Sequence, residues 1–478
     1  MTNAAANITF YERVEDALQD TQARGAFDRA TKRFTTLRTA ALTSLPMNGD
    51  PTRDQARAIR AETLRHLDRY LAQFADAVEA AGGKVHWAAD AAEANRMVCE
   101  IAQTNQVKRV VKSKSMVSEE IHLNHALEAI GCEVIESDLG EYIIQLAGET
   151  PSHIITPVIH KTKEQVAEIL RDRIGMPPTN EVAEMTAFVR AKMREIFLTA
   201  DMGISGVNFG VAETGTIVTV TNEGNGRMTT TCPRLHVAVM GIERLVPTLE
   251  DLSVMLQVLG RSATGQKLSV YTNLITGPRR ANEPDGPDEL HVVLIDNGRS
   301  KVLGSEVAEI LYCIRCGACL NACPVYREIG GHAYGSVYPG PIGSVVTPAL
   351  YGVAAWSDLP HASSLCGACR EVCPVRIDLP GLLLKLRHQA DEAGKTPKYL
   401  QLGLRGFRLV GTHPTLFRLG VKFASFGSRL IASHGWIKRL PGPLAHWTQS
   451  RDFPVFAKES FSTQLKKRRS ASGTEGKR

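Results

Sequence analysis

Seven of the ten cysteines in this 478-residue chain fall between residues 313 and 373, in two short motifs. The first motif, CIRCGACLNACP, spans 313–324 and the second, SSLCGACREVCP, spans 363–374. Thiolates packed at this spacing are soft ligands that suit iron–sulfur clusters. In two-cluster ferredoxins, three cysteines of such a motif bind one cluster and the fourth binds the other. The motifs therefore predict two clusters that are held jointly.

Applied to this chain, the rule leaves one of the two ligand sets incomplete. The first cluster is assigned the ligands Cys313, Cys316, Cys319 and Cys373. The second is assigned Cys323, Cys366 and Cys369. Ser363 stands where the repeat has its first cysteine. The second centre is therefore predicted to be a [3Fe–4S] cluster, or a [4Fe–4S] cluster with a non-cysteine ligand on its fourth iron.

Several groups are candidates for that fourth position. They are a solvent hydroxide, the Ser363 oxygen, His332, His361, Cys99, Cys132 and Cys232. A substrate carboxylate or hydroxyl is a further candidate, because an open coordination position lets a metal act as a Lewis acid. An electron-transfer cluster with one unusual ligand is the preferred interpretation, since ligand changes also tune the reduction potential. Zinc is the alternative, but its usual two CxxC pairs match these motifs poorly.

The segment before the cysteines is expected to position them through an α/β layer. Strand patterns at 84–88, 108–115 and 132–137 alternate with helix patterns at 91–106 and 118–131. Such alternation predicts a mainly parallel sheet. Further along we expect a helix over 180–200 capped by Thr179 or Asn180, and strands at 267–275 and 289–296. Helical patterns, glycine loops and cysteines replace the strands after residue 300.

Four segments follow from these patterns. They are a helical N-terminal segment at 1–70, an α/β domain at 71–300, a helical ferredoxin-type domain at 301–390, and a basic helical region at 391–478. The last residues, KKRRSASGTEGKR, have the composition of a disordered end. The chain shows neither a signal-peptide pattern nor an apolar run long enough to span a membrane. We therefore expect a cytoplasmic protein.

The basic residues are concentrated at the C-terminal end. Residues 385–478 hold 19 Lys and Arg against 5 Asp and Glu. Leu, Phe and Trp alternate there with Arg and Lys at helical spacing, which fits a helix on the inner membrane surface or a docking surface for an acidic partner. A helical subdomain packed on the cluster domain is the simpler interpretation. Nucleic-acid binding is not expected, because no known reading motif is present.

Other ligand-binding motifs have structural explanations. No GxGxxG follows a strand, so a dinucleotide site is not predicted and an organic redox cofactor must come from a partner. The segment 208–218 forms either an anion-binding concavity or, more simply, a glycine turn. The residues 111–120 start a helix that would bind an anion with Lys112 and Lys114, or simply be capped by Ser115 or Ser118.

The ordered combination of these segments resembles a known family. KSKSMVSEEI, GVNFGVAETGTIV and CPRLHVAVMGIERLVP precede the cysteine motifs and GHAYGSVYPGPIG. Together they resemble the iron–sulfur lactate utilisation protein B family over roughly residues 70 to 460. The resemblance implies an α/β part similar to the sugar-isomerase and CoA-transferase-like fold. It also implies the same seven cysteine ligands, so Ser363 is no departure from the family.

The same resemblance implies a function. Members are thought to act with two companion proteins in oxidising L-lactate to pyruvate, carrying electrons through two [4Fe–4S] clusters. We therefore expect an electron-transfer subunit that passes electrons to an acceptor, rather than a stand-alone enzyme, and we assign no catalytic residue. One alternative is electron transfer from another 2-hydroxy acid such as glycolate. Another is a transferase or isomerase whose clusters are regulatory.

Overall fold

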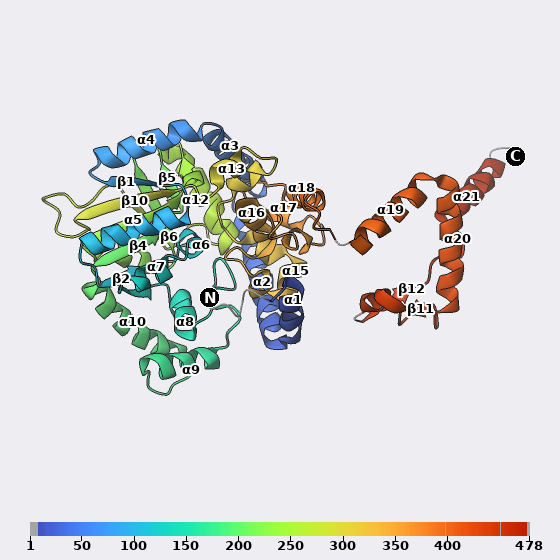
Figure 1. Ribbon diagram of the computed structural model, residues 1–478, viewed down its shortest axis with the longest axis horizontal. Coiled ribbons are helices and arrows are strands. Elements are labelled where there is room, and N and C mark those ends of the chain that lie inside the picture. Colours follow the sequence, from blue (N-terminus) through green and yellow to red (C-terminus); the bar gives the residue numbers. More distant parts are fainter. Residues whose placement is uncertain (1–7, 397, 450, 476–478) are drawn as a thin grey trace. The chain divides into compact units, whose positions relative to one another are not determined.

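The α/β part of the chain is built on a six-stranded sheet (Figure 1). The computed structural model describes residues 8–396, 398–449 and 451–475. The strand order is β1-β10-β7-β4-β2-β3, and every neighbouring pair is parallel. The strands are β1 Lys84–Ala88, β2 Arg109–Lys112, β3 Glu133–Glu136, β4 Met202–Gly206, β7 Leu235–Gly241 and β10 Glu289–Ile295. The predicted parallel sheet is confirmed.

Both faces of the sheet are buried, because alternate side chains of each strand point to opposite sides. On β7, Leu235, Val237 and Val239 pack with the helices of one side. These helices are α5 Ala91–Thr104, α6 Met116–Glu120 and α7 Leu123–Ala129. Ala238 and Met240 join the core on the other side. A third core under β2 and β3 is covered by α8 Leu139–Ala147, α9 Lys163–Ile174 and α10 Val182–Thr199.

A smaller sheet lies in the core on the Ala238 side of β7. Its strand order is β8-β5-β6-β9, with β5 Phe209–Val211, β6 Thr216–Thr221, β8 Leu245–Val246 and β9 Tyr271–Ile275. The segment 208–218 is the hairpin of β5 and β6. Gly215 has a φ of +66°, and a Cβ there would lie 2.5 Å from the Val78 nitrogen. The glycine turn predicted for this segment is therefore what the chain forms.

Helices from both ends of the first unit surround the cysteines. The first unit extends to Ala393. Its N-terminal helices are α1 Phe10–Gln19, α2 Thr21–Leu42, η2 Pro46–Gly49, α3 Asp50–Arg65 and α4 Leu67–Ala80. Between the strands lie α11 Asn225–Thr231, η3 Ile242–Arg244 and α12 Leu249–Ala263. The helices after β10 are α13 Arg299–Leu303, η4 Ala308–Tyr312, α14 Ala318–Ala322, α15 Pro324–Ile329, η5 His332–Tyr334, α16 Gly340–Tyr351, η6 Leu359–His361, α17 Ala368–Val372 and α18 Leu379–Glu392. Helix α2 packs on α14 and α15, so the N-terminal segment forms a wall of the cysteine region.

The second unit spans residues 394–478 and is mostly helical. Its elements are α19 Lys398–Thr412, α20 Pro414–Leu430, β11 Trp436–Ile437, η7 Gly442–Thr448, β12 Phe453–Pro454 and α21 Phe461–Glu475. Disorder was predicted from residue 466 onward, yet α21 is helical to Glu475; residues 476–478 lie outside the described part. Among the described helices, none has the length and apolarity needed to cross a bilayer.

Three local predictions differ from the structure. The helix expected over 118–131 is two helices, α6 and α7, because His122 adopts a left-handed conformation with φ +54°. Helix α10 begins after Glu181 without a side-chain cap, and Thr179 Oγ1 instead accepts a hydrogen bond from the Glu181 N–H at 3.1 Å. The strand expected at 267–275 starts only at Tyr271.

Candidate iron–sulfur site

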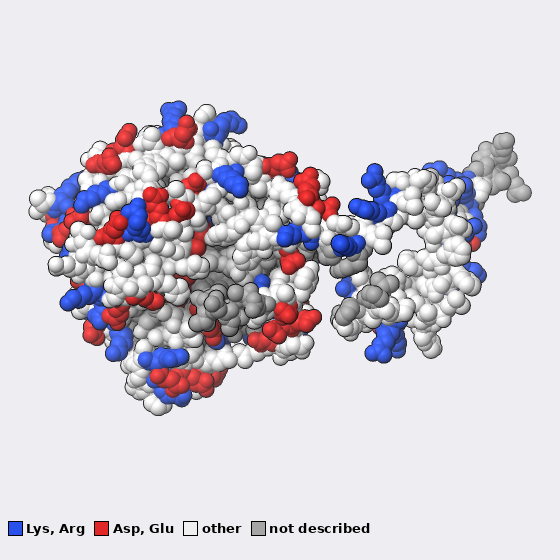
Figure 2. Space-filling model, viewed as in Figure 1, with Lys and Arg blue, Asp and Glu red and all other residues white. Residues whose placement is uncertain are grey.

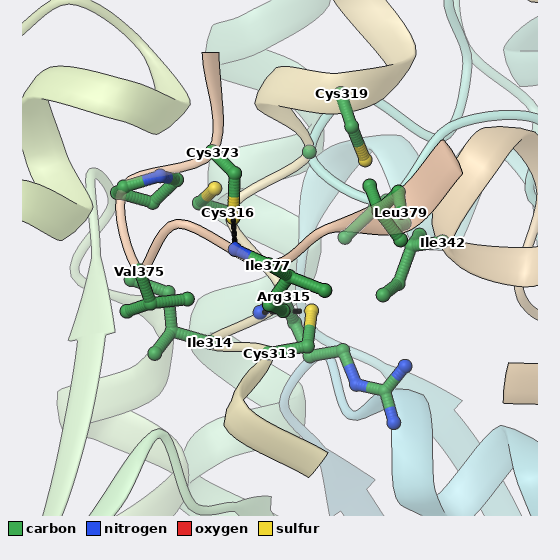
Figure 3. A pocket seen from close by; sticks show the side chains of 13 residues that line it. Cys313, Ile314, Arg315, Cys316, Cys319, Ile342, Cys373, Val375, Ile377 and Leu379 are labelled. Atoms are coloured by element: carbon green, nitrogen blue, oxygen red, sulfur yellow. Dashed lines mark hydrogen bonds between the residues drawn. The ribbon is translucent and has the colours of Figure 1, made fainter. Parts of the chain in front are cut away.

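Four cysteines from the two motifs line one internal cavity. They are Cys313, Cys316 and Cys319 of the first motif and Cys373 of the second. Figure 3 shows these side chains around the cavity. The rest of its wall is largely apolar: Ile154, Ile314, Ile342, Val375, Ile377 and Leu379. The predicted first ligand set is thus brought together, in surroundings that exclude water.

Short helices and glycines set the positions of the sulfur atoms. Gly317 has a φ of +72° and precedes α14, which carries Cys319. In the second motif Gly367, with φ +85°, precedes α17, and Cys373 follows that helix directly. A left-handed residue at these two places turns the chain sharply, which glycine does without steric cost. The tight turn lets cysteines on both sides of it face one cavity.

The thiols are strongly affected by burial. Burial raises the pKa of Cys316 to about 12 and that of Cys373 to about 11. Backbone N–H groups donate to two of the sulfur atoms, from Arg315 to Cys313 Sγ and from Ile377 to Cys373 Sγ, each at 3.3 Å. Metal coordination deprotonates a thiol, and such N–H bonds stabilise the resulting thiolate. The donor set therefore fits a thiolate-bound iron–sulfur cluster.

Arginines surround this cavity. Arg53 donates to the Cys373 carbonyl at 2.9 Å, and Arg244 donates to the Cys313 carbonyl at 3.2 Å. Arg315 lines the cavity itself; its guanidinium lies 4.0 Å from Glu243, and its buried Nε and Nη1 have no hydrogen-bond partner. Buried N–H groups of a cation are costly to leave without an acceptor. The arginines thus support an anionic occupant of the cavity, which a thiolate-bound cluster is.

The remaining three cysteines form a second group. Cys323, Cys366 and Cys369 lie close enough for their charges to influence one another. Burial raises the pKa of Cys369 to about 12, whereas the Ala368 N–H and Ser364 hydroxyl lower the pKa of Cys366. Cys366 is exposed and Cys369 is buried. The second predicted ligand set is therefore also brought together, at a position closer to solvent.

Comparison with known proteins gives the family. Family models match residues 71–295 as a LUD domain, 309–377 as a 4Fe-4S dicluster domain, and 387–470 as lactate utilisation protein B, C-terminal. The chain is 48% identical to lactate utilization protein B of Bacillus pumilus over 96% of its own length and 97% of the relative's. The family is therefore clear. This chain belongs to the lactate utilisation protein B family.

A second relative agrees with this membership. Lactate utilization protein B of Shouchella clausii is also 48% identical, over 97% of this chain and 98% of the relative. A DUF162 family protein from Deinococcus radiodurans has a crystal structure that covers 48% of this chain and 98% of its own, at 14% identity and a TM-score of 0.28. That score is too low to carry an argument. The dicluster match makes residues 309–377 an iron–sulfur segment, as in the family.

Most of the other side chains considered as the fourth ligand of the second cluster are held by other contacts. Cys99 and Cys132 donate to the Ala126 and Val107 carbonyls in the core under α5 and α7. Cys232 is exposed and lines a separate groove beside Arg234 and Arg279. The His332 ring is hydrogen-bonded to the Thr150 carbonyl at 2.7 Å. Among the described residues, no three His, Cys, Asp or Glu converge on a point that would hold a single ion.

The lysines at the start of α6 are used by the fold. Lys112 is fully buried between Glu136 at 2.7 Å and Glu119 at 2.9 Å. Lys114 donates to the Ile155 carbonyl at 3.0 Å. Ser115 caps α6 by accepting from the Ser118 N–H at 3.2 Å. The cap predicted for this segment is therefore present, with Ser115 as the capping residue.

Proposed function

We propose that this protein is the iron–sulfur electron-transfer component of a multi-protein system that oxidises L-lactate to pyruvate. The observation that carries the proposal is the cavity in which cysteines of both motifs meet. Cys313, Cys316, Cys319 and Cys373 would hold one [4Fe–4S] cluster, and Cys323, Cys366 and Cys369 the second. The names of the family relatives support lactate utilisation as the process in which it acts.

The chemistry of lactate fits two one-electron centres. Oxidation of the hydroxyl carbon to a ketone releases two electrons and two protons. When bound, each cluster supplies one place that accepts and releases a single electron. The chain itself holds the cysteine sulfurs in place through Gly317 and the N–H bonds, and it excludes water with the apolar wall. Companion proteins would complete the system in the cytoplasm, and a separate acceptor would take the electrons.

The second unit supports a contact with an anionic membrane surface. Residues 398–430 contain six Lys and Arg and no Asp or Glu. On α20 an apolar stripe at three- and four-residue intervals consists of Leu416, Leu419, Phe423, Phe426 and Leu430, and all five are exposed. Figure 2 shows mainly Lys and Arg among the charged residues on the visible face of this unit. An apolar face beside a cationic face is the pattern of a helix that lies in the lipid interface.

Growth of a deletion strain tests the function. A strain lacking this protein is expected to fail on L-lactate, to grow on glucose, and to be rescued by the wild-type chain but not by C316A. The matched control is C232A, because Cys232 is an exposed cysteine outside both ligand sets. Growth of the deletion strain on L-lactate, with loss of growth on glycolate instead, would move the electron source to another 2-hydroxy acid. Rescue by C316A would favour a cluster-independent enzyme.

A further inference from the structure

The two cysteine motifs repeat the same backbone path. A 3-10 helix precedes each motif, η4 before Cys313 and η6 before Ser363. Two residues after the first residue of each motif, the backbone takes a left-handed conformation, with φ +58° at Arg315 and +54° at Leu365. A left-handed glycine and a five-residue helix follow in both. The motifs are therefore structural repeats, and equivalent positions can be compared one by one.

Ser363 takes the place of Cys313 in this repeat. In the first motif the Arg315 N–H donates to Cys313 Sγ at 3.3 Å. In the second motif the Leu365 N–H donates to Ser363 Oγ at 3.1 Å. The same backbone group thus points at the side-chain atom of the first residue in each motif. The Ser363 oxygen is oriented as the ligand sulfur of the first motif is.

Ser363 belongs to the motif that supplies Cys366 and Cys369, two of the three cysteines assigned to the incomplete second ligand set. Cys366 follows three residues later, as Cys316 follows Cys313. The charges of Cys366 and Cys323 both act on Cys369. Cys99, Cys132 and Cys232 are held in the α/β part, as described above. Of the side chains considered for this position, Ser363 is the one whose backbone geometry matches that of a proposed ligand.

From this correspondence we propose that Ser363 Oγ is the fourth protein ligand of the second cluster, which is then a complete [4Fe–4S] centre. The inference rests on the proposed function, because it requires the second cluster. Binding forms one Fe–O bond and breaks the Ser363 O–H bond. The proton leaves to solvent, which is near because Cys366 is exposed. No electron is transferred in this step.

Iron counting on the full-length protein tests the inference. Wild-type protein, S363A, S363C and S253A are reconstituted anaerobically, briefly oxidised with ferricyanide, and assayed for iron, sulfide and EPR. Ser253 is the control, since it is an exposed serine on α12 whose hydroxyl donates only to the Glu250 carbonyl of its own helix. We expect about eight irons in the wild type, S253A and S363C. S363A is expected to lose one iron and to show a [3Fe–4S] signal.

The outcomes separate this inference from the proposed function. Equal iron in S363A and the wild type, or a wild type with about seven irons, overturns the serine ligand but leaves the electron-transfer role. Loss of one iron in H361A but not in S363A would assign the position to His361. If S363A does not fold, Mössbauer spectra of S363C decide: one iron site must change from oxygen to sulfur ligation, and an unchanged spectrum overturns the inference. A wild type without iron contradicts the proposed function itself.

Discussion

Arg315 is the cation closest in sequence to the first cysteine group, and the repeat has Leu365 in its place. Its guanidinium stacks 4.1 Å from the centre of the Tyr338 ring, and its side chain is only 9% exposed. The nearest carboxylate, Glu243, lies 4.0 Å away. A cluster held by four thiolates gains a further negative charge on reduction, and burial opposes that gain. The positive charge of Arg315 would offset part of the cost of adding this negative charge, and it would do so for the first cluster, whose cavity it lines.

Replacing Arg315 by Met or Gln is expected to lower the midpoint potential of the first cluster and leave the second nearly unchanged. R315K, which keeps the charge, should shift the potential of the first cluster less. An EPR-monitored redox titration measures the midpoint potentials of both clusters, and the signal that is lost in C316A identifies the first cluster. R370M is the control, because Arg370 sits beside a cysteine of the second motif but is 65% exposed and screened by water. An unchanged potential in both neutral variants would contradict the role.

Arg60 is a second buried arginine, and its role is to stabilise the fold. Its fully buried guanidinium donates to the carbonyls of Leu245 at 2.7 Å and Leu311 at 2.9 Å, and also to that of Glu243. R60M leaves these buried acceptors unsatisfied, so we expect a loss of about 3–5 kcal/mol in the free energy of unfolding. Anaerobic urea unfolding measures it. R65M, at an exposed position of the same helix, should change the free energy by less than about 0.5 kcal/mol.

Glu141 makes the stability of the α/β part depend on pH. Burial raises its pKa to about 8, against the opposing charge of Lys114 at 3.6 Å. The folded state therefore keeps a proton that the unfolded state releases near pH 4.5, and this contribution to stability is lost as pH rises toward 8. E141Q should flatten the unfolding free energy between about pH 5 and 8. E168Q, at an exposed position of α9, is the control, and an unchanged slope in E141Q would contradict the raised pKa.

At the scale of elements, the sequence predicted those helices and strands whose pattern lies within their own residues. The strand 84–88 follows a pair of glycines, and the strand 289–295 carries the β-branched Val292, Val293 and Ile295, so both were predictable. The break at His122 was not, because nothing in residues 118–131 interrupts the helical pattern. The cysteine groups followed from spacing alone. The arginine surroundings did not, since Arg53 and Arg244 reach cysteine carbonyls far away in sequence.

The helices α19 and α20 lead to a prediction about lipid binding. Phe407 on α19 and Phe423 on α20 are 70% and 68% exposed. Replacing both by Glu is expected to abolish co-sedimentation with phosphatidylserine-containing vesicles, because the change charges the apolar faces. The control replaces Glu459, a half-buried residue of the same unit outside α19 and α20, by Gln. Equal binding of wild-type protein to pure phosphatidylcholine vesicles would exclude recognition of anionic lipid, and binding only to an acidic companion protein would assign the surface to that partner.

At the scale of the whole molecule, the division after Ala393 separates the proposed cluster ligands from the surface proposed to bind a membrane. All seven predicted cysteine ligands, the arginines around the cavity and Ser363 belong to the first unit. The core that packs around the cysteines extends to Leu386 on α18. The first unit therefore has what cluster binding requires.

A chain ending at Ala393 is accordingly expected to retain the iron content and both EPR signals of the full-length protein. It should lose vesicle binding, because the six cations and the apolar stripe of residues 398–430 are removed. In the deletion strain it should restore growth on L-lactate weakly or not at all, since electrons would reach the clusters but the protein would no longer be held near its acceptor. Full rescue by the shortened chain would show that attachment through the second unit is dispensable. Loss of iron would show instead that the second unit is needed to form the cluster site.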